Sequence, residues 1–221
     1  MLEPKITKLI TVNNELIVSA DDCGRWLNMS PAAIIAQADI LESLIITATD
    51  VIESYSWLSL RQKTFEAYYE CLYNDTLLLN RAPVMSISDI EYLYNDNWVL
   101  LDKGVMTIDG LYENVTEKTE RINYASIYLR NSINIEDREN AYKIRVTYDS
   151  GYDINAIDEA LKIPEKIKTA IKMIVAFYFV NRGDCESDCN LGGFKVPCAA
   201  KSIIDQFSIS NIEIGGCHGL C

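Results

Sequence analysis

An unbroken apolar seam between residues 30 and 55 is the strongest constraint that this sequence places on its own folding. Its members recur at alternating intervals of four and three residues, which is the repeat of one face of an α-helix. They are Ile34, Ala38, Leu41, Ile45, Ala48, Ile52 and Tyr55. Ser30 and Pro31 precede the run and suit the N-cap and first turn of a helix. The seam predicts one long helix from Ser30 to Tyr55 that packs against other helices, in the same chain or in a neighbouring copy.

Two shorter elements are expected before this helix. Residues 5–17 carry apolar side chains in an extended pattern. Ser19 is a good N-cap residue, and Asp22 stands three residues later, in the position of a capping box. The sequence therefore predicts an extended segment followed by a short helix over residues 20–28.

From about residue 60 the apolar period changes to two, which is typical of strands with one buried face. Turn residues such as Asn95-Asp96-Asn97 separate the candidates. The predicted strands cover residues 64–71, 77–79, 87–94, 98–101, 105–108, 122–129 and 143–148. We therefore expect a β-rich block over residues 60–150, inserted between helices.

The chain returns to a helical pattern after residue 151. Pro164 suits a helix start, and Ile167, Ile171, Ile174 and Tyr178 form one face of the predicted helix. The run 173–180 is apolar on every side, which predicts a central helix that is buried on most sides. A short last helix is expected from about residue 197 to residue 207.

These patterns predict the α+β class: a helical bundle with an inserted antiparallel β-rich block. The expected division is a helical core from residues 1–59 and 151–183, the β-rich insertion at 60–150, and a cysteine-rich tail at 184–221 with a possible short helix.

Charge and histidine content exclude several classes of function. Lys and Arg total 20 against 32 Asp and Glu, a formal net charge of −12. An acidic chain repels phosphate backbones, so ordinary DNA binding is disfavoured, although DNA could slide past such a surface without sticking. With His218 as the single histidine, most imidazole-based catalysis and metal binding is excluded. We assign no catalytic, cofactor-binding or metal residue and no cofactor.

The sequence shows no targeting signal and no apolar run long enough to cross a bilayer, so we expect a protein made in a cytoplasm. The seven cysteines leave alternatives open, because five of them fall in the last 37 residues. Cys185, Cys189, Cys217 and Cys221 could bind zinc, form a disulfide after release from the cell, or stay as free thiols. Cys217 or Cys221 could also pair with His218 as a thiol nucleophile. A small zinc- or thiol-dependent interaction module is therefore the alternative function.

Four short motifs, in their order and spacing, resemble a known family of virus proteins. The first joins the long helix to the following strand, the second leads into the next strand, the third ends the last strand of the block, and the fourth opens the C-terminal helix. The matching residues are Ala48, Ile52, Glu53, Gln62 and Thr64; Pro83, Val84, Ser86 and Ile87; Val146, Tyr148, Gly151 and Tyr152; and Pro164, Ile167, Lys168, Ala170, Ile171 and Arg182. Over residues 5–183 the chain resembles the head-to-tail connector (adaptor, or head-completion) proteins of tailed bacteriophages, in the subtype with a β-rich insertion. It departs from them at Tyr55-Ser56-Trp57, where the family often has a Thr-Gly-Arg-like turn, and in the tail after Gly183.

The resemblance implies a structural role without catalysis. Such proteins form a ring, usually of 12 copies, below the portal of a DNA-filled capsid. They extend the DNA channel and carry the next neck or tail protein, so the implied location is the virion neck after synthesis in a host bacterial cytoplasm. Double-stranded DNA passes through the lumen during packaging and ejection without sequence-specific binding, and no membrane is involved.

The resemblance also suggests which residues make contacts. The seam residues would pack helices or neighbouring subunits. The segment after the last long helix commonly reaches toward the portal in this family, so Gly192, Gly193, Phe194, Ile203 and Phe207 are candidates for portal docking. We expect removal of residues 184–221 to leave the rest of the chain folded.

Overall fold

The structure is a computed structural model that describes residues 3–69, 76–101, 106–109, 126–129, 143–153, 155, 162–181 and 189–208. It divides into two compact units. The sheet unit comprises Met1–Ile17 and Ser59–Ile163, and the helical unit comprises Val18–Leu58 and Pro164–Cys221. None of the helices in the described part of the chain is long and apolar enough to span a membrane.

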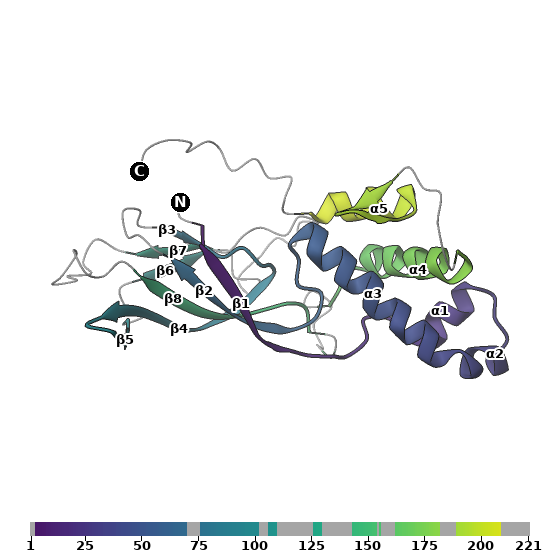
Figure 1. The fold of residues 1–221 in the computed structure, drawn as a ribbon, viewed down its shortest axis with the longest axis horizontal. Coiled ribbons are helices and arrows are strands. Elements are labelled where there is room, and N and C mark those ends of the chain that lie inside the picture. The colour runs from purple at the N-terminus through teal and green to yellow at the C-terminus, as the bar shows by residue number, and fades with distance from the viewer. Residues whose placement is uncertain are drawn as a thin grey trace. The chain divides into compact units, whose positions relative to one another are not determined.

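The sheet unit is built on a five-stranded antiparallel sheet with the strand order β1-β2-β8-β4-β5 (Figure 1). These strands are β1 (Ile6–Val12), β2 (Lys63–Tyr69), β8 (Ile144–Ser150), β4 (Val84–Tyr94) and β5 (Asn97–Leu100). A second antiparallel sheet has the order β3-β7-β6, with β3 (Thr76–Leu78), β7 (Ser126–Leu129) and β6 (Met106–Asp109). The predicted strands are confirmed where the structure describes them, and residues 70–75, 102–105 and 122–125 lie outside the described part.

Alternation along the strands explains the core of this unit. In β8 the even-numbered residues from Ile144 to Ser150 are buried and the odd-numbered ones are half-buried, because successive side chains point to opposite faces. One hydrophobic cluster joins residues of both sheets. Its members are Phe65, Ala67, Tyr69, Leu77, Leu79, Val84, Ile87, Ile90, Leu101, Ile127, Ile144, Val146 and Tyr148. The aromatic rings of Phe65 and Tyr148 stack within it, with centroids 5.6 Å apart.

The N-terminal strand corrects one expected boundary. The sequence placed residues 1–59 in the helical core, but β1 pairs with β2 along its whole length, from Ile6 opposite Tyr68 to Val12 opposite Lys63. A strand needs a partner for its backbone groups, and β2 supplies it 50 residues further along the chain. The first 17 residues therefore belong to the sheet unit, and residues 151–163 belong there too.

Gly151 closes the last strand in a conformation that other residues rarely adopt. Its φ is +117°, and a Cβ atom at this position would lie 2.2 Å from the carbonyl oxygen of Arg61. Its backbone N–H donates to the carbonyl of Pro83 (2.9 Å). The glycine of the third motif is thus required by a close approach of two backbone segments.

The helical unit contains α1 (Ala20–Trp26), α2 (Pro31–Ala36), α3 (Ala38–Ser56), α4 (Glu165–Val180) and α5 (Cys198–Phe207). The two-residue strands β9 (Asn190–Leu191) and β10 (Phe194–Lys195) form a hairpin before α5 (Figure 1). The predicted caps are confirmed: Ser19 Oγ accepts from the Asp22 N–H (3.1 Å), and Ser30 Oγ accepts from the Ala33 N–H (3.3 Å). Helices in one unit and antiparallel sheets in the other confirm the predicted α+β class.

The single long helix expected from Ser30 to Tyr55 is wrong at one point. Gln37 leaves the helical conformation, with φ −121° and ψ 16°, and separates α2 from α3. Asp39 then lies in the first turn of α3, where a negative charge favours a helix N-terminus. The apolar period continues across this break, which is why the seam alone did not reveal it.

The seam residues of α3 lie in the interior of the helical unit. Leu41, Ile45, Ala48 and Ile52 are fully buried, while Ala38 and Tyr55 are half-buried. Helix α3 packs against α4, α1 and α5, and α4 packs against α5. The expectation for the end of α4 is wrong: residues 176–179 are only half-buried, and Val180 is largely exposed. Its last turn contacts the β9–β10 hairpin, where the Tyr178 hydroxyl donates to the Lys195 carbonyl (3.0 Å), but is not enclosed by the described residues.

Replacement of Ile45 by Asp tests the role of the seam. Ile45 is 0% exposed, whereas the adjacent Ile46 is 42% exposed. We expect Ile45→Asp to lower the unfolding free energy by about 3–5 kcal/mol, because it buries a carboxylate without a designed partner. Ile46→Asp is the matched control and should cost less than about 1 kcal/mol. Urea denaturation followed by circular dichroism measures both, and equal stability of the two variants would show that the seam is not packed in the isolated chain.

Candidate interaction surfaces

The outer face of the five-stranded sheet carries a row of hydrogen-bonded polar side chains. Thr11 Oγ1 donates to Thr64 Oγ1 (2.8 Å), and Thr64 Oγ1 donates to Asp149 Oδ1 (2.8 Å). Ser86 Oγ donates to the other oxygen, Asp149 Oδ2 (2.8 Å). The row crosses β1, β2, β8 and β4, and the Asp149 carboxylate accepts from both sides. Such cross-strand pairs fix the register of a sheet whose outer face is hydrated.

A shallow hollow of about 630 Å³ opens over this row. Most of its lining residues carry hydroxyl, amide or carboxylate groups, and polar and apolar atoms line it about equally. The lining residues are Thr11, Val12, Asn13, Gln62, Lys63, Thr64, Met85, Ser86, Asp149, Ser150 and Asp153. Within the described residues, no group of three or more His, Cys, Asp or Glu side chains could hold a metal ion. The hollow is open and of mixed polarity, which suits contact with another surface better than enclosure of a small ligand.

A second row on the sheet unit joins cations and aromatic rings. Lys8 Nζ lies 4.6 Å from the ring centre of Tyr68, and Tyr68 contacts Trp98 edge-on with centroids 6.1 Å apart. The Arg145 guanidinium lies 4.6 Å from the Trp98 ring, and its Nε donates to Glu91 Oε2 (2.6 Å). Burial would lower the pKa of Arg145, but hydrogen bonds to Glu91 and Tyr68 outweigh it and raise that pKa. This row extends from the first strand of the sheet to the last, and each contact crosses between strands.

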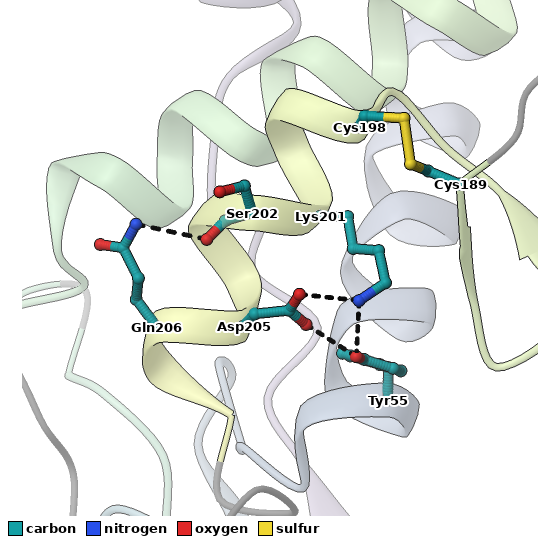
Figure 2. A network of polar contacts seen from close by, with 7 residues as sticks. All are labelled: Tyr55, Cys189, Cys198, Lys201, Ser202, Asp205 and Gln206. Atoms are coloured by element: carbon teal, nitrogen blue, oxygen red, sulfur yellow. Dashed lines mark hydrogen bonds and ion pairs between the residues drawn. A yellow bond between two sulfur atoms is a disulfide. The ribbon is translucent and has the colours of Figure 1, made fainter.

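In the helical unit, a three-residue network ties α5 to the last turn of α3 (Figure 2). Lys201 Nζ donates to Asp205 Oδ2 (2.7 Å) and to the Tyr55 hydroxyl oxygen (3.0 Å), and that hydroxyl donates to Asp205 Oδ1 (2.7 Å). The hydrogen bond that Lys201 donates to Asp205 is the main cause of the raised pKa of Lys201. Burial would raise the pKa of Asp205, but the hydrogen bonds from Lys201 and Tyr55 overcome it and lower that pKa. The network holds both charges in place on α5.

A disulfide between Cys189 and Cys198 fastens the β9–β10 hairpin to the first residue of α5 (Figure 2). The hairpin is also held by the Val196 N–H, which donates to the Cys189 carbonyl (3.0 Å), and by the Tyr178 hydroxyl, which donates to the Lys195 carbonyl (3.0 Å). The disulfide corrects the four-thiolate zinc hypothesis, because Cys189 is bonded to a cysteine outside the proposed set. The other three members, Cys185, Cys217 and Cys221, lie outside the described residues, as does His218.

The described free thiol, Cys23, is buried in α1. Burial raises the pKa of the Cys23 thiol to about 11, despite the opposing effect of Lys172. It is therefore a neutral thiol at pH 7 and a poor nucleophile. Its environment is that of a small apolar core residue.

The residues predicted to dock on a portal divide into two groups. Gly192 and Gly193 form the hairpin turn with φ values of +56° and +95°, and Phe194 beside them is about half exposed. Ile203 is half-buried and Phe207 is buried, since Ala200, Ile204 and Phe207 form the inner face of α5. The expectation that residues 184–221 could be removed without harm is therefore wrong, because the deletion would take away part of the core of the helical unit.

The sequence patterns did not predict the Tyr55–Lys201–Asp205 network, the disulfide pairing or the two rows on the sheet. Only the first had a local signal, since Lys201 and Asp205 are four residues apart on one helix. The rows join strands that are distant in the sequence.

Comparisons with known proteins identify this fold in particle necks. No protein-family model and no curated protein sequence matches the chain. A chain in the virion of a native gene transfer agent (GTA) particle matches with a TM-score of 0.68 and 13% identity, over 95% of this chain and 98% of that one. A chain in the neck of an empty GTA particle computed with C6 symmetry matches with a TM-score of 0.64 and 14% identity, over 92% and 96%. A chain in the neck of a native GTA particle computed with C12 symmetry gives 0.54 and 12%, over 90% and 96%. At these identities the likeness shows a shared fold.

The pKa shift of Asp205 predicts a defined acid sensitivity. Because its folded pKa is lowered from 3.8, the stabilisation is complete above that value and is lost as the pH falls through the folded pKa. We expect the unfolding free energy of the wild type to fall more steeply on acidification below about pH 4 than that of Asp205→Asn. Glu42→Gln, at an exposed position of α3, is the control and should follow the wild type. Parallel curves for wild type and Asp205→Asn would contradict the network.

The disulfide predicts a difference between oxidised and reduced protein. We expect Cys198→Ser to lower the unfolding free energy by about 2–3 kcal/mol, because it frees a short loop in the unfolded chain. Denaturation with and without reductant provides the internal control: reductant should destabilise the wild type and leave the variant unchanged. An equal response of both proteins to reductant would show that this bond does not stabilise the fold.

Proposed function

We propose that this chain is a structural protein of a particle neck. It forms a ring below the portal, extends the DNA channel and joins the capsid to the next neck or tail component. The observation that carries the proposal is the shared fold with chains of two GTA necks, each matched over at least 90% of both chains. The connector-like motifs point to the same place in a particle independently of those comparisons.

The physical properties of the chain support this role. A subunit of a closed ring needs two different surfaces that meet head to tail. The described residues include exposed apolar side chains in both units, among them Leu9, Leu100, Ile35 and Val180. A formal charge of −12 lets DNA pass without retention, since it repels the phosphate backbone. Twelve copies accord with the C12 symmetry used for one of the matched necks.

In this proposal the partners are the portal protein, the next neck or tail protein and further copies of the chain. The protein is made in the host bacterial cytoplasm and ends in the virion neck. It has no catalytic activity and needs no cofactor. The β9–β10 hairpin is the portal-docking element, with Phe194 as its exposed apolar side chain.

Co-expression with the portal protein of the same particle, followed by electron microscopy of the purified complex, tests this function. We expect a ring of this chain stacked on the portal ring. Recovery of bare portal rings, with this chain eluting separately as a folded protein, would overturn the proposal.

The docking element has its own test. Phe194→Asp should abolish co-purification with the portal and leave the melting temperature nearly unchanged, because the side chain is half exposed. Phe207→Asp should instead unfold the helical unit, because that side chain is buried. Normal docking of a folded Phe194→Asp protein would remove the hairpin from the portal interface.

A further inference from the structure

The five-stranded sheet ends in β1 on one side and in β5 on the other. Among the described residues, no strand pairs with the outer side of either. The outer backbone groups of an edge strand can pair with a strand of another chain. Both edges also carry apolar side chains at the surface: Ile6, Leu9 and Ile10 on β1 are about half exposed, and Leu100 on β5 is 61% exposed.

The regular parts of the two edge strands have matching lengths. In β1 the register is regular from Ile6 to Leu9 and shifts between Leu9 and Thr11, where Ile10 is the extra residue of a bulge. Strand β5 runs over four residues, Asn97–Leu100. A bulge usually limits pairing at an edge, so here it leaves a straight stretch of β1 as long as β5.

The two edges carry opposite charge. The charged side chains at β1 are Lys5, just before the strand, and Lys8 within it; Glu3 and Glu15 flank this stretch. Over the β4–β5 hairpin, residues 84–101, the charged side chains are Asp89, Glu91 and Asp96, with no Lys or Arg. Asp89 and Asp96 are exposed, while Glu91 is bound to Arg145. In a chain with a strong negative charge, β1 is a basic edge facing away from an acidic one.

Strand direction decides how copies can join. Each neighbouring pair in the order β1-β2-β8-β4-β5 is antiparallel, so β1 and β5 run in the same direction. A rotation about an axis along the strands places β5 of one copy beside β1 of the next, in parallel pairing. This contact uses a different edge on each copy, which is the head-to-tail arrangement that closes into a ring.

We propose that β1 of one copy pairs edge to edge with β5 of the next copy, so that the five-stranded sheets continue around the ring. The assignment of this contact to a ring rests on the proposed neck function; the pairing itself rests on the edges, lengths and charges of the sheet unit. Apolar contact between Ile6 and Leu100, which lie on the same face of the sheet, together with attraction between the lysines and aspartates, favours a second copy of the chain as the partner of each edge.

A charge-reversal experiment on the full-length chain tests the pairing. One variant, Lys5→Glu with Lys8→Glu, makes both edges acidic. The other, Asp89→Lys with Asp96→Asn, removes the acidic edge and leaves both edges basic; Asn suits position 96, where φ is +62°. Sedimentation velocity over a concentration series should show each variant associating at least about tenfold more weakly than the wild type. An equimolar mixture should recover association, because each basic edge then meets an acidic one.

The control is Glu42→Lys, a charge reversal at an exposed position of α3, which should associate like the wild type. A mixture that does not recover association overturns the proposal, and so does a wild type that stays monomeric up to about 1 mM. Loss of association in the lysine variant alone would show that the acidic edge is not the partner of β1 and would also overturn the proposal.

The failure of this contact and the failure of the neck function give different results. Rings on the portal that both charge variants still form would leave the neck role standing and refute the edge pairing. Recovery in the mixture without any ring on the portal would support the pairing and refute the neck role.

Discussion

The pairing of β1 with β2 is the contact on which the arrangement of the whole chain depends. It joins residues 6–12 to residues 63–69, and α1, α2 and α3 all lie between them in the sequence. The sheet unit is therefore complete only when residues on both sides of α1, α2 and α3 have come together. The hydrogen bonds from Thr11 to Thr64 and from Thr64 to Asp149 link β1 and β2 to β8. Strand β8 is the last strand of the sheet unit before the chain enters the helical unit for the second time. The sheet is assembled from distant segments, and its register depends on contacts across them.

Local patterns in the sequence predicted most elements, because their causes are local. The caps at Ser19 and Ser30, the apolar face of α3 and the alternation in β8 each depend on residues within a few positions of one another. The partner of β1, the disulfide from Cys189 to Cys198 and the bond from Tyr55 to Asp205 depend on tertiary structure. The break at Gln37 was not predicted because the apolar period of the seam continues across it. The burial of Phe207 was not predicted because the sequence pattern of a short amphipathic helix is the same whether the helix lies at the surface or in the core. The candidate contact surfaces were accordingly harder to predict than the fold.

The two units offer different kinds of surface for a proposed neck protein. The helical unit has a tightly packed interior, and its exposed apolar side chains include Ile46 on α3, Val180 at the end of α4 and Phe194 on the hairpin. The sheet unit presents an outer face with mixed charge and, among the described strands, two edges without a pairing partner. Within the proposal the two units make different contacts: the hairpin contacts the portal protein, and the sheet edges contact further copies of the chain. Opposite charge on the two edges would give the copies a unique order and orientation.

The chain passes between the two units three times, after Ile17, after Leu58 and after Ile163. Three covalent connections have a consequence for mechanical and proteolytic resistance. A single cut in any one of them leaves the units joined through the other two, so a nicked subunit keeps both parts. A pulling force applied to one unit is likewise divided over three backbone segments. Within the proposed neck role, these three connections keep the two units of a subunit together without any added bond.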